Sequence, residues 1–128
     1  MTAGLASAHC DSILGVLRNV TYSGFTPYLQ QHTGDPGPAG TSNVSAETTR
    51  KALTFAAPST VGSNRSSTAS QVSWTWSAGG ETLTHGSIWD APSGGTFKGS
   101  LAWSSSRDVA NGDTVNATVT ATQGTLAV

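Results

Sequence analysis

Apolar and polar residues alternate along much of the chain, and the alternation is clearest between residue 71 and residue 128. In the segments Gln71–Trp76 and Thr114–Thr120, the apolar residues recur at every second position. A period of two places one face of a β-strand against a core and the other face in water. The pattern therefore predicts an all-β fold.

Six segments with this pattern are predicted strands, and runs of Gly, Pro, Ser, Asn and Asp separate them as turns do. They cover residues 25–32, 49–55, 70–77, 82–89, 96–103 and 113–122, and residues 124–128 add a final short strand. The Asn-Gly pair at residues 111–112 is the strongest of the turn signals. About seven short strands at this spacing predict an antiparallel β-sandwich, of jelly-roll or immunoglobulin-like type, or a small barrel.

Two longer stretches interrupt the strands. Residues 33–40 are a cluster of Gly, Pro and Asp, which predicts a turn or an exposed loop. Residues 56–70 are rich in serine and show no periodicity, so we predict a long loop or an arm there.

A helix is predicted near the start of the chain, over residues 3–19. Its apolar residues fall near the i, i+3, i+4 spacing of one helix face: Leu5, Ile13, Val16, Leu17 and Val20. Asp11 or Ser12 is the expected N-cap of a shorter alternative helix. We therefore expect an N-terminal helical segment over residues 1–24 and a β-sandwich over residues 25–128, within a single domain.

Only 10% of the residues are charged and the net charge is −1, against about 25% charged residues in an average soluble protein. Serine and threonine are abundant instead, at 18 and 19 residues. Such a neutral, hydroxyl-rich surface fits a protein inside an assembly, because net charge is what keeps isolated proteins apart. The six Lys and Arg are scattered, so no nucleic-acid partner is expected.

No apolar run reaches the length of a membrane span, and no secretory signal is expected. The single cysteine excludes an intramolecular disulfide and is consistent with assembly in a reducing cytoplasm. Residues His9, His32 and His85 lack the spacing of zinc ligands, and no metal or cofactor is predicted. The chain also lacks a nucleophile elbow, so the prediction is that it is not an enzyme.

The four tryptophans are Trp74, Trp76, Trp89 and Trp103. Exposed indoles could stack on sugar rings, which would make the domain a carbohydrate-binding module. The competing interpretation, which we favour, is that they build the core of a chain that has few other large apolar residues.

Three stretches resemble small tail-associated proteins of tailed bacteriophages, often called minor tail or tail fibre proteins, particularly those of phages of actinobacteria. The first is residues 28–41, a short strand followed by His-Thr-Gly-Asp-Pro-Gly. The second is residues 83–96, with Thr-His and then Ala-Pro-Ser-Gly-Gly. The third runs from Gly99 through Gly112-Asp113-Thr114-Val115.

The resemblance implies a virion structural protein with a β-sandwich fold, no cofactor and no reaction. We expect a tail-associated, minor-tail or fibre-type subunit that contacts other phage structural proteins and forms a homo-oligomer. It would be assembled in the bacterial cytoplasm and reside in the virion. The alternatives are a capsid decoration protein, which would use residues 1–8 or 56–70 as an arm, and the carbohydrate-binding module.

Overall fold

A computed structural model describes residues 3–123 and confirms the all-β fold. One short helical segment precedes the strands: α1 (Ser7–Gly15) and the 3-10 turn η1 (Val16–Arg18). The strands are β1 (Tyr28–His32), β2 (Lys51–Ala52), β3 (Ser59–Val61), β4 (Asn64–Thr68), β5 (Val72–Thr75), β6 (Glu81–Trp89), β7 (Phe97–Val109), β8 (Thr114–Ala117) and β9 (Thr120–Gln123).

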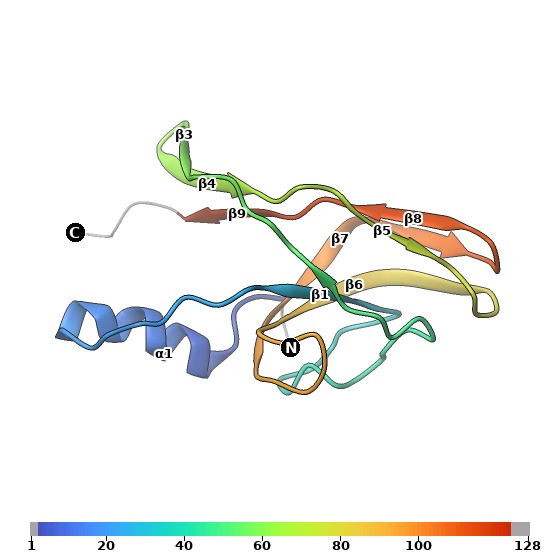
Figure 1. The fold of residues 1–128 in the computed structure, drawn as a ribbon, viewed down its shortest axis with the longest axis horizontal. Coiled ribbons are helices and arrows are strands. Elements are labelled where there is room, and N and C mark those ends of the chain that lie inside the picture. Colours follow the sequence, from blue (N-terminus) through green and yellow to red (C-terminus); the bar gives the residue numbers. More distant parts are fainter. Residues whose placement is uncertain (1–2, 124–128) are drawn as a thin grey trace.

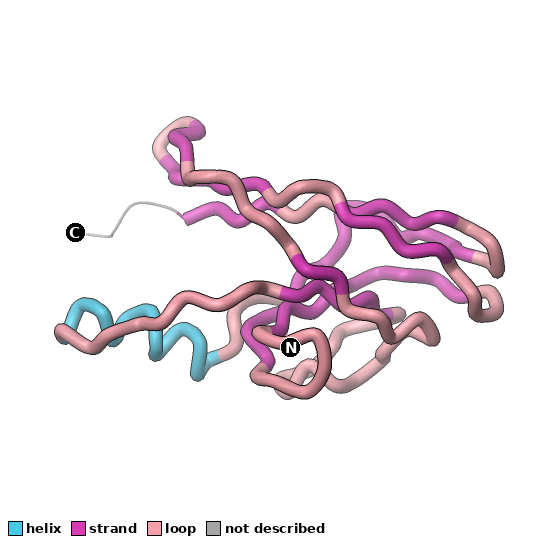
Figure 2. The backbone as a smooth tube through the Cα atoms, viewed as in Figure 1, coloured by secondary structure: helices cyan, strands magenta, loops and turns pink. Residues whose placement is uncertain are grey.

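The strands form two layers, as Figure 1 shows. The lower layer is a four-stranded antiparallel sheet in the order β2-β1-β6-β7. The upper layer joins the sheet β3-β4-β9 to the pair β5-β8, and Figure 2 shows β4 leading into β5 and β8 into β9. A backbone hydrogen bond of 2.8 Å from Ala69 N to Val119 O holds these two parts together. The result is a sandwich of antiparallel strands.

The alternating pattern fills the space between the layers. In β8, Val115 and Ala117 are buried whereas Thr114 and Asn116 are exposed, as a strand with one face on a core requires. The central core residues come from both layers: Leu29, Leu53, Ala69, Trp74, Trp76, Leu83, Val109, Val115 and Ala117.

Hydroxyl pairs link the two strands of the β4–β9 ladder in the upper layer. Ser66 pairs with Thr122 and Thr68 pairs with Thr120 across the β4–β9 ladder, at 3.4 Å and 3.0 Å between the hydroxyl oxygens. Such cross-strand pairs stabilise a sheet by a few tenths of a kcal/mol, on the order of 0.5 each. Some of the abundant Ser and Thr of the sequence thus pair with each other across this ladder.

Two predictions between residues 49 and 70 are corrected. The strand predicted over residues 49–55 is only the two residues of β2, beside a bridge between Phe55 and Ala69. The predicted loop at residues 56–70 is wrong, because it contains the hairpin β3–β4 with a two-residue turn. Gly62 opens this turn with φ +61°, a conformation that glycine adopts without steric cost.

The predicted helix exists, but it begins later than predicted. It begins at Ser7, after Ala6, so neither Asp11 nor Ser12 is its N-cap; the Ser12 hydroxyl donates to Ala8 O instead, at 2.9 Å. The predicted apolar face is exposed, and the buried residue of α1 is His9. The division into residues 1–24 and 25–128 stays a prediction, and the strand predicted at residues 124–128 lies outside the described residues.

Candidate assembly surface

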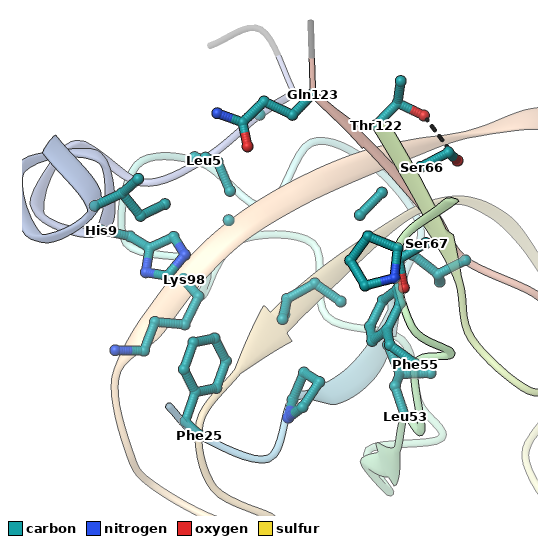
Figure 3. Close-up of a pocket in the computed structure, with 18 of the residues that line it drawn as sticks. Leu5, His9, Phe25, Leu53, Phe55, Ser66, Ser67, Lys98, Thr122 and Gln123 are labelled. Atoms are coloured by element: carbon teal, nitrogen blue, oxygen red, sulfur yellow. Dashed lines mark hydrogen bonds between the residues drawn. The ribbon is translucent and has the colours of Figure 1, made fainter. Parts of the chain in front are cut away.

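A large groove opens at one end of the sandwich (Figure 3). At this end Figure 1 shows the helical segment below and the sheet β3-β4-β9 above. The volume of the groove is about 1040 Å³. Most of its lining is apolar or uncharged: Gly4, Leu5, His9, Ile13, Phe25, Thr26, Pro27, Leu53, Thr54, Phe55, Pro58, Arg65, Ser66, Ser67, Ile88, Lys98, Gly99, Ser100, Val119, Ala121, Thr122 and Gln123. The two layers of the sandwich therefore do not close on each other at this end.

The lower wall of the groove is attached to the edge of β7. Ala6 N donates to Lys98 O at 2.9 Å, and Ser100 N donates to Gly4 O at 2.7 Å, so that residues 4–6 extend the sheet. Gly99 makes this approach feasible, because a Cβ atom there would lie 2.7 Å from Gly4 O. The helix that follows is held next to the sandwich by this backbone contact.

His9 fixes the inner side of the helix. Its ring contacts Tyr22 and Phe25 edge-on, with centroids 5.9 Å and 5.6 Å away, and its Nδ1 lies 3.3 Å from the Tyr22 hydroxyl. Burial, and then the neighbouring Lys98, lower the pKa of His9 below its usual value. A neutral His9 packs as an aromatic side chain in this wall.

Lys98 and Arg65 carry the charge of the groove. The Lys98 ammonium lies 3.3 Å from an Asp90 carboxylate oxygen and 4.9 Å from the centre of the Phe25 ring. On the upper wall, Arg65 donates to Thr60 Oγ1 at 2.6 Å and to Pro58 O at 2.8 Å. The lining itself contains no Asp or Glu, and Asp90 outside it balances the charge of Lys98.

The outer side of the helical segment is an apolar ridge made of Leu14, Val16, Leu17 and Val20. These side chains are 57%, 53%, 74% and 54% exposed, and none of them lines the groove. Of the eight exposed large hydrophobic residues in the described part of the chain, six lie between residues 5 and 20. A concentration of this kind marks an interaction site on a soluble protein.

Three of the four predicted tryptophan sites lie in the interior. Trp74, Trp76 and Trp89 are buried, and Trp103 is half-buried. Their indole N–H groups are occupied in three cases: Trp74 donates to Thr49 O, Trp89 to Ser87 Oγ and Trp103 to Gln31 Oε1. Glycan stacking by these residues stays a prediction, and their burial supports the core interpretation that we favour.

The fourth indole, that of Trp76, differs from the indole of Trp74 in its hydrogen bonding. Trp76 Nε1 is buried without a hydrogen-bond partner among the described residues, whereas Trp74 Nε1 donates to Thr49 O at 2.8 Å. We expect Trp74→Phe to lower the free energy of unfolding by about 1–2 kcal/mol more than Trp76→Phe, because the first change removes a hydrogen bond whereas the second removes a buried donor that has no partner. Urea denaturation of both variants measures the difference. Equal midpoints would contradict this account of the two indoles.

A serine–histidine pair occurs inside the lower sheet, and sequence reasoning did not find it. His32 Nε2 lies 2.7 Å from Ser87 Oγ, the spacing of a nucleophile and its base, but both residues have no exposed surface. Because a carbonyl only accepts, His32 Nδ1 donates to Ser42 O at 2.8 Å. Trp89 Nε1–H donates to Ser87, and the Ser87 hydroxyl donates to His32, so the pair is a link in a buried structural chain.

The buried histidine predicts a loss of stability in mild acid. Burial lowers the pKa of His32, and the nearby His85 and Arg50 lower it further. The hydrogen bonds of His32 to the backbone at Ser42 and Asn43 raise its pKa and offset part of this effect. Below about pH 6.5, His32 therefore binds a proton in the unfolded chain but stays neutral in the folded chain until the pH is lower. The stability that neutral His32 contributes is complete above that pH and is lost as the pH falls toward the lower folded pKa.

Thermal unfolding between pH 7.5 and pH 5 measures this effect, in a window above the titration of the carboxylates. We expect the melting temperature to fall with pH, and to fall less steeply in His32→Asn. The slope that remains in the variant belongs to His9, whose pKa is also lowered. A wild-type melting temperature that is independent of pH would contradict the neutral, buried imidazole.

Among the described residues, no three His, Cys, Asp or Glu side chains come together as metal ligands would. Within residues 3–123, no helix has the length and apolar character that crossing a membrane requires.

The comparison with known families covers nearly the whole chain. The family described as "Podophage GP4 fiber I protein gp80" matches residues 5–125, which include both walls of the groove and the ridge. No curated protein matches the chain. The extent of the family match identifies the chain as a member of this family of phage tail fibre proteins.

Proposed function

We propose that this chain is a structural subunit of a phage tail fibre that works by contact with copies of itself and with other virion proteins, without performing a reaction. The observation that carries the proposal is the open end of the sandwich, where an apolar groove and an apolar ridge are both uncovered. A lone protein gains nothing from such surfaces, whereas a subunit buries them on assembly. The family of fibre proteins to which the chain belongs supports the same function.

The low charge of the chain supports an assembled state as well. Few charged side chains remain to hold neighbouring copies apart or to protect sheet edges, which other proteins protect with Lys and other charges. An actinobacterial host and assembly in its cytoplasm are further parts of this proposal. They rest on the resemblance of residues 28–41 and 83–96 to tail-associated proteins of phages of actinobacteria.

Electron microscopy of virions labelled with an antibody against the purified chain tests the proposal. We expect label on the fibres of the tail. Label confined to the head shell would contradict the tail placement and would favour the capsid decoration protein instead.

A further inference from the structure

We propose that Asn111 is a modification site, a deamidation site that the folded turn closes and the unfolded chain opens. The inference is independent of the proposed function. It rests on the chemistry of the Asn-Gly pair at residues 111–112, and on the hydrogen bonds that hold this pair between β7 and β8.

Deamidation at an Asn-Gly pair begins at the backbone nitrogen of the glycine. After losing its proton to a hydroxide ion, Gly112 N attacks the side-chain carbonyl carbon of Asn111. The new C–N bond closes a five-membered succinimide, the bond from Cγ to Nδ2 breaks, and the amide nitrogen leaves as ammonia with a proton from water. Water then opens the ring to aspartate or isoaspartate. The net change consumes water, releases ammonia and needs no oxidant or reductant.

Asn111 is the asparagine of this chain that is best suited to the reaction. Glycine follows it, and a residue without a Cβ atom leaves the attack unhindered and bends readily toward the side chain. Asn111 and Gly112 are also exposed, so hydroxide and water reach them. The other asparagines are followed by residues with side chains: Asn19 by Val20, Asn43 by Val44, Asn64 by Arg65 and Asn116 by Ala117.

The folded turn opposes this reaction at the attacking nitrogen. Gly112 N donates to Trp76 O at 2.7 Å, and Trp76 N donates to Asp113 O at 2.7 Å. The proton that the reaction must remove is therefore held by the carbonyl of a core residue, since Trp76 is 1% exposed. A nitrogen anion at Gly112 would face the lone pairs of that carbonyl instead of donating to it. Proton loss at Gly112 therefore requires local opening of the turn.

Two further hydrogen bonds close the turn on itself. Asp113 N donates to Ala110 O at 3.1 Å, and Ala110 N donates to an Asp113 carboxylate oxygen at 2.9 Å. The backbone at Gly112 has φ +93°, which glycine adopts without steric cost. Turning Gly112 N toward the Asn111 side chain therefore breaks hydrogen bonds of a turn that is free of strain.

Deamidation would leave a permanent change in the turn. Aspartate adds a negative charge two residues before Asp113, and isoaspartate adds a carbon atom to the main chain between residues 111 and 112. The longer backbone cannot keep the hydrogen bonds of both Gly112 N and Asp113 O to Trp76. A chain that stays unfolded for long thus loses the anchor of this turn, whereas a folded chain keeps it.

Peptide mass spectrometry of the purified full chain tests the proposal. The chain is incubated in mildly alkaline buffer, with and without guanidinium chloride, and the conversion of each asparagine is followed with time. In the denaturant, we expect Asn111 to react faster than the other asparagines. In the folded chain, we expect the rate at Asn111 to be at least about tenfold lower, because the hydrogen-bonded turn must open first. Equal rates at Asn111 in the two states would overturn the proposal, as would an Asn111 no faster than Asn116 in the denaturant.

A pair of variants tests the part that the turn plays. Asp113→Ala removes the carboxylate to which Ala110 N donates. Asp108→Ala is the matched control, because Asp108 is an exposed aspartate that accepts from Thr82 Oγ1 at 2.6 Å, outside the turn. We expect the ratio of the unfolded to the folded rate at Asn111 to fall about fivefold in Asp113→Ala and to stay unchanged in the control. A wild-type ratio in Asp113→Ala, or the same fall in both variants, would overturn the proposal.

Hydrogen exchange of the Gly112 amide in the wild-type chain tests the closed turn without any variant. We expect slow exchange, because this amide donates to Trp76 O. Circular dichroism verifies that both variants have the wild-type fold. Exchange at Gly112 as fast as in the unfolded chain would overturn the proposal, even where Asp113→Ala fails to fold.

Discussion

Trp89→Ala is expected to lower the free energy of unfolding by about 4 kcal/mol, because it removes a large buried side chain from the lower sheet. The indole is 7% exposed, packs against Phe97 with ring centroids 5.5 Å apart, and donates to Ser87. The Arg50 guanidinium lies 4.0 Å from the ring centre and is held by the carbonyls of Ala91 and Gly94. Loss of the ring therefore disturbs packing, a buried hydrogen bond and an ordered loop together.

Urea denaturation of the variant measures this cost. Trp89→Phe is the matched control: it keeps an aromatic ring beneath Arg50 but leaves Ser87 without the donor, and we expect a loss of about 2 kcal/mol. A midpoint for Trp89→Ala close to that of the wild type would contradict the placement of this side chain in the interior.

Gly40→Ala is expected to cost about 3 kcal/mol, although it adds one methyl group. A Cβ atom at this position would lie 2.3 Å from Phe97 Cδ2, and the ring cannot move freely because it packs against Trp89. Overpacking of this kind costs about 1–3 kcal/mol. The backbone at Gly40 also has φ +73°, which adds about 1–2 kcal/mol for a residue with a side chain.

Gly62→Ala separates the two causes. Gly62 has φ +61°, but a Cβ atom there would meet nothing within 4 Å. Only the backbone cost of about 1 kcal/mol is then expected. If both alanine variants unfold at the same urea concentration, the overlap with Phe97 is not the cause of the larger loss.

The strands were the most predictable part of the molecule. Segments such as Thr114–Ala117 have one buried and one exposed face, and this arrangement requires an apolar residue at every second position. The hairpin β3–β4 was missed because its side chains are mostly exposed and polar, so burial imposes no alternation on them. Its signal was the Gly62-Ser63 pair, a two-residue turn of the kind that opens with glycine.

The helical segment shows a different limit of prediction from the sequence. The spacing of Leu5, Ile13, Val16, Leu17 and Val20 indicated a helix with one apolar face. Periodicity records which side chains favour burial, but not whether the partner belongs to the same chain. The exposed ridge is therefore visible only once the position of the helix is known.

The groove and the buried hydrogen bonds could not be predicted for a related reason. The groove joins residues as distant as Leu5 and Thr122, and Ser87 meets His32 across 55 positions of sequence. Such contacts depend on strand order and register, for which the local pattern carries no signal. The pairing of β1 with β6 brings His32 beside β6 and makes the contact with Ser87 feasible.

A cryo-electron microscopy map of the intact virion tests the assignment most directly. The account predicts density for this fold in the fibres of the tail, with Leu14 and Leu17 of each copy covered by a neighbouring subunit. Density for the fold on the head shell alone, or copies in the fibre whose ridge and groove both face solvent, would contradict it.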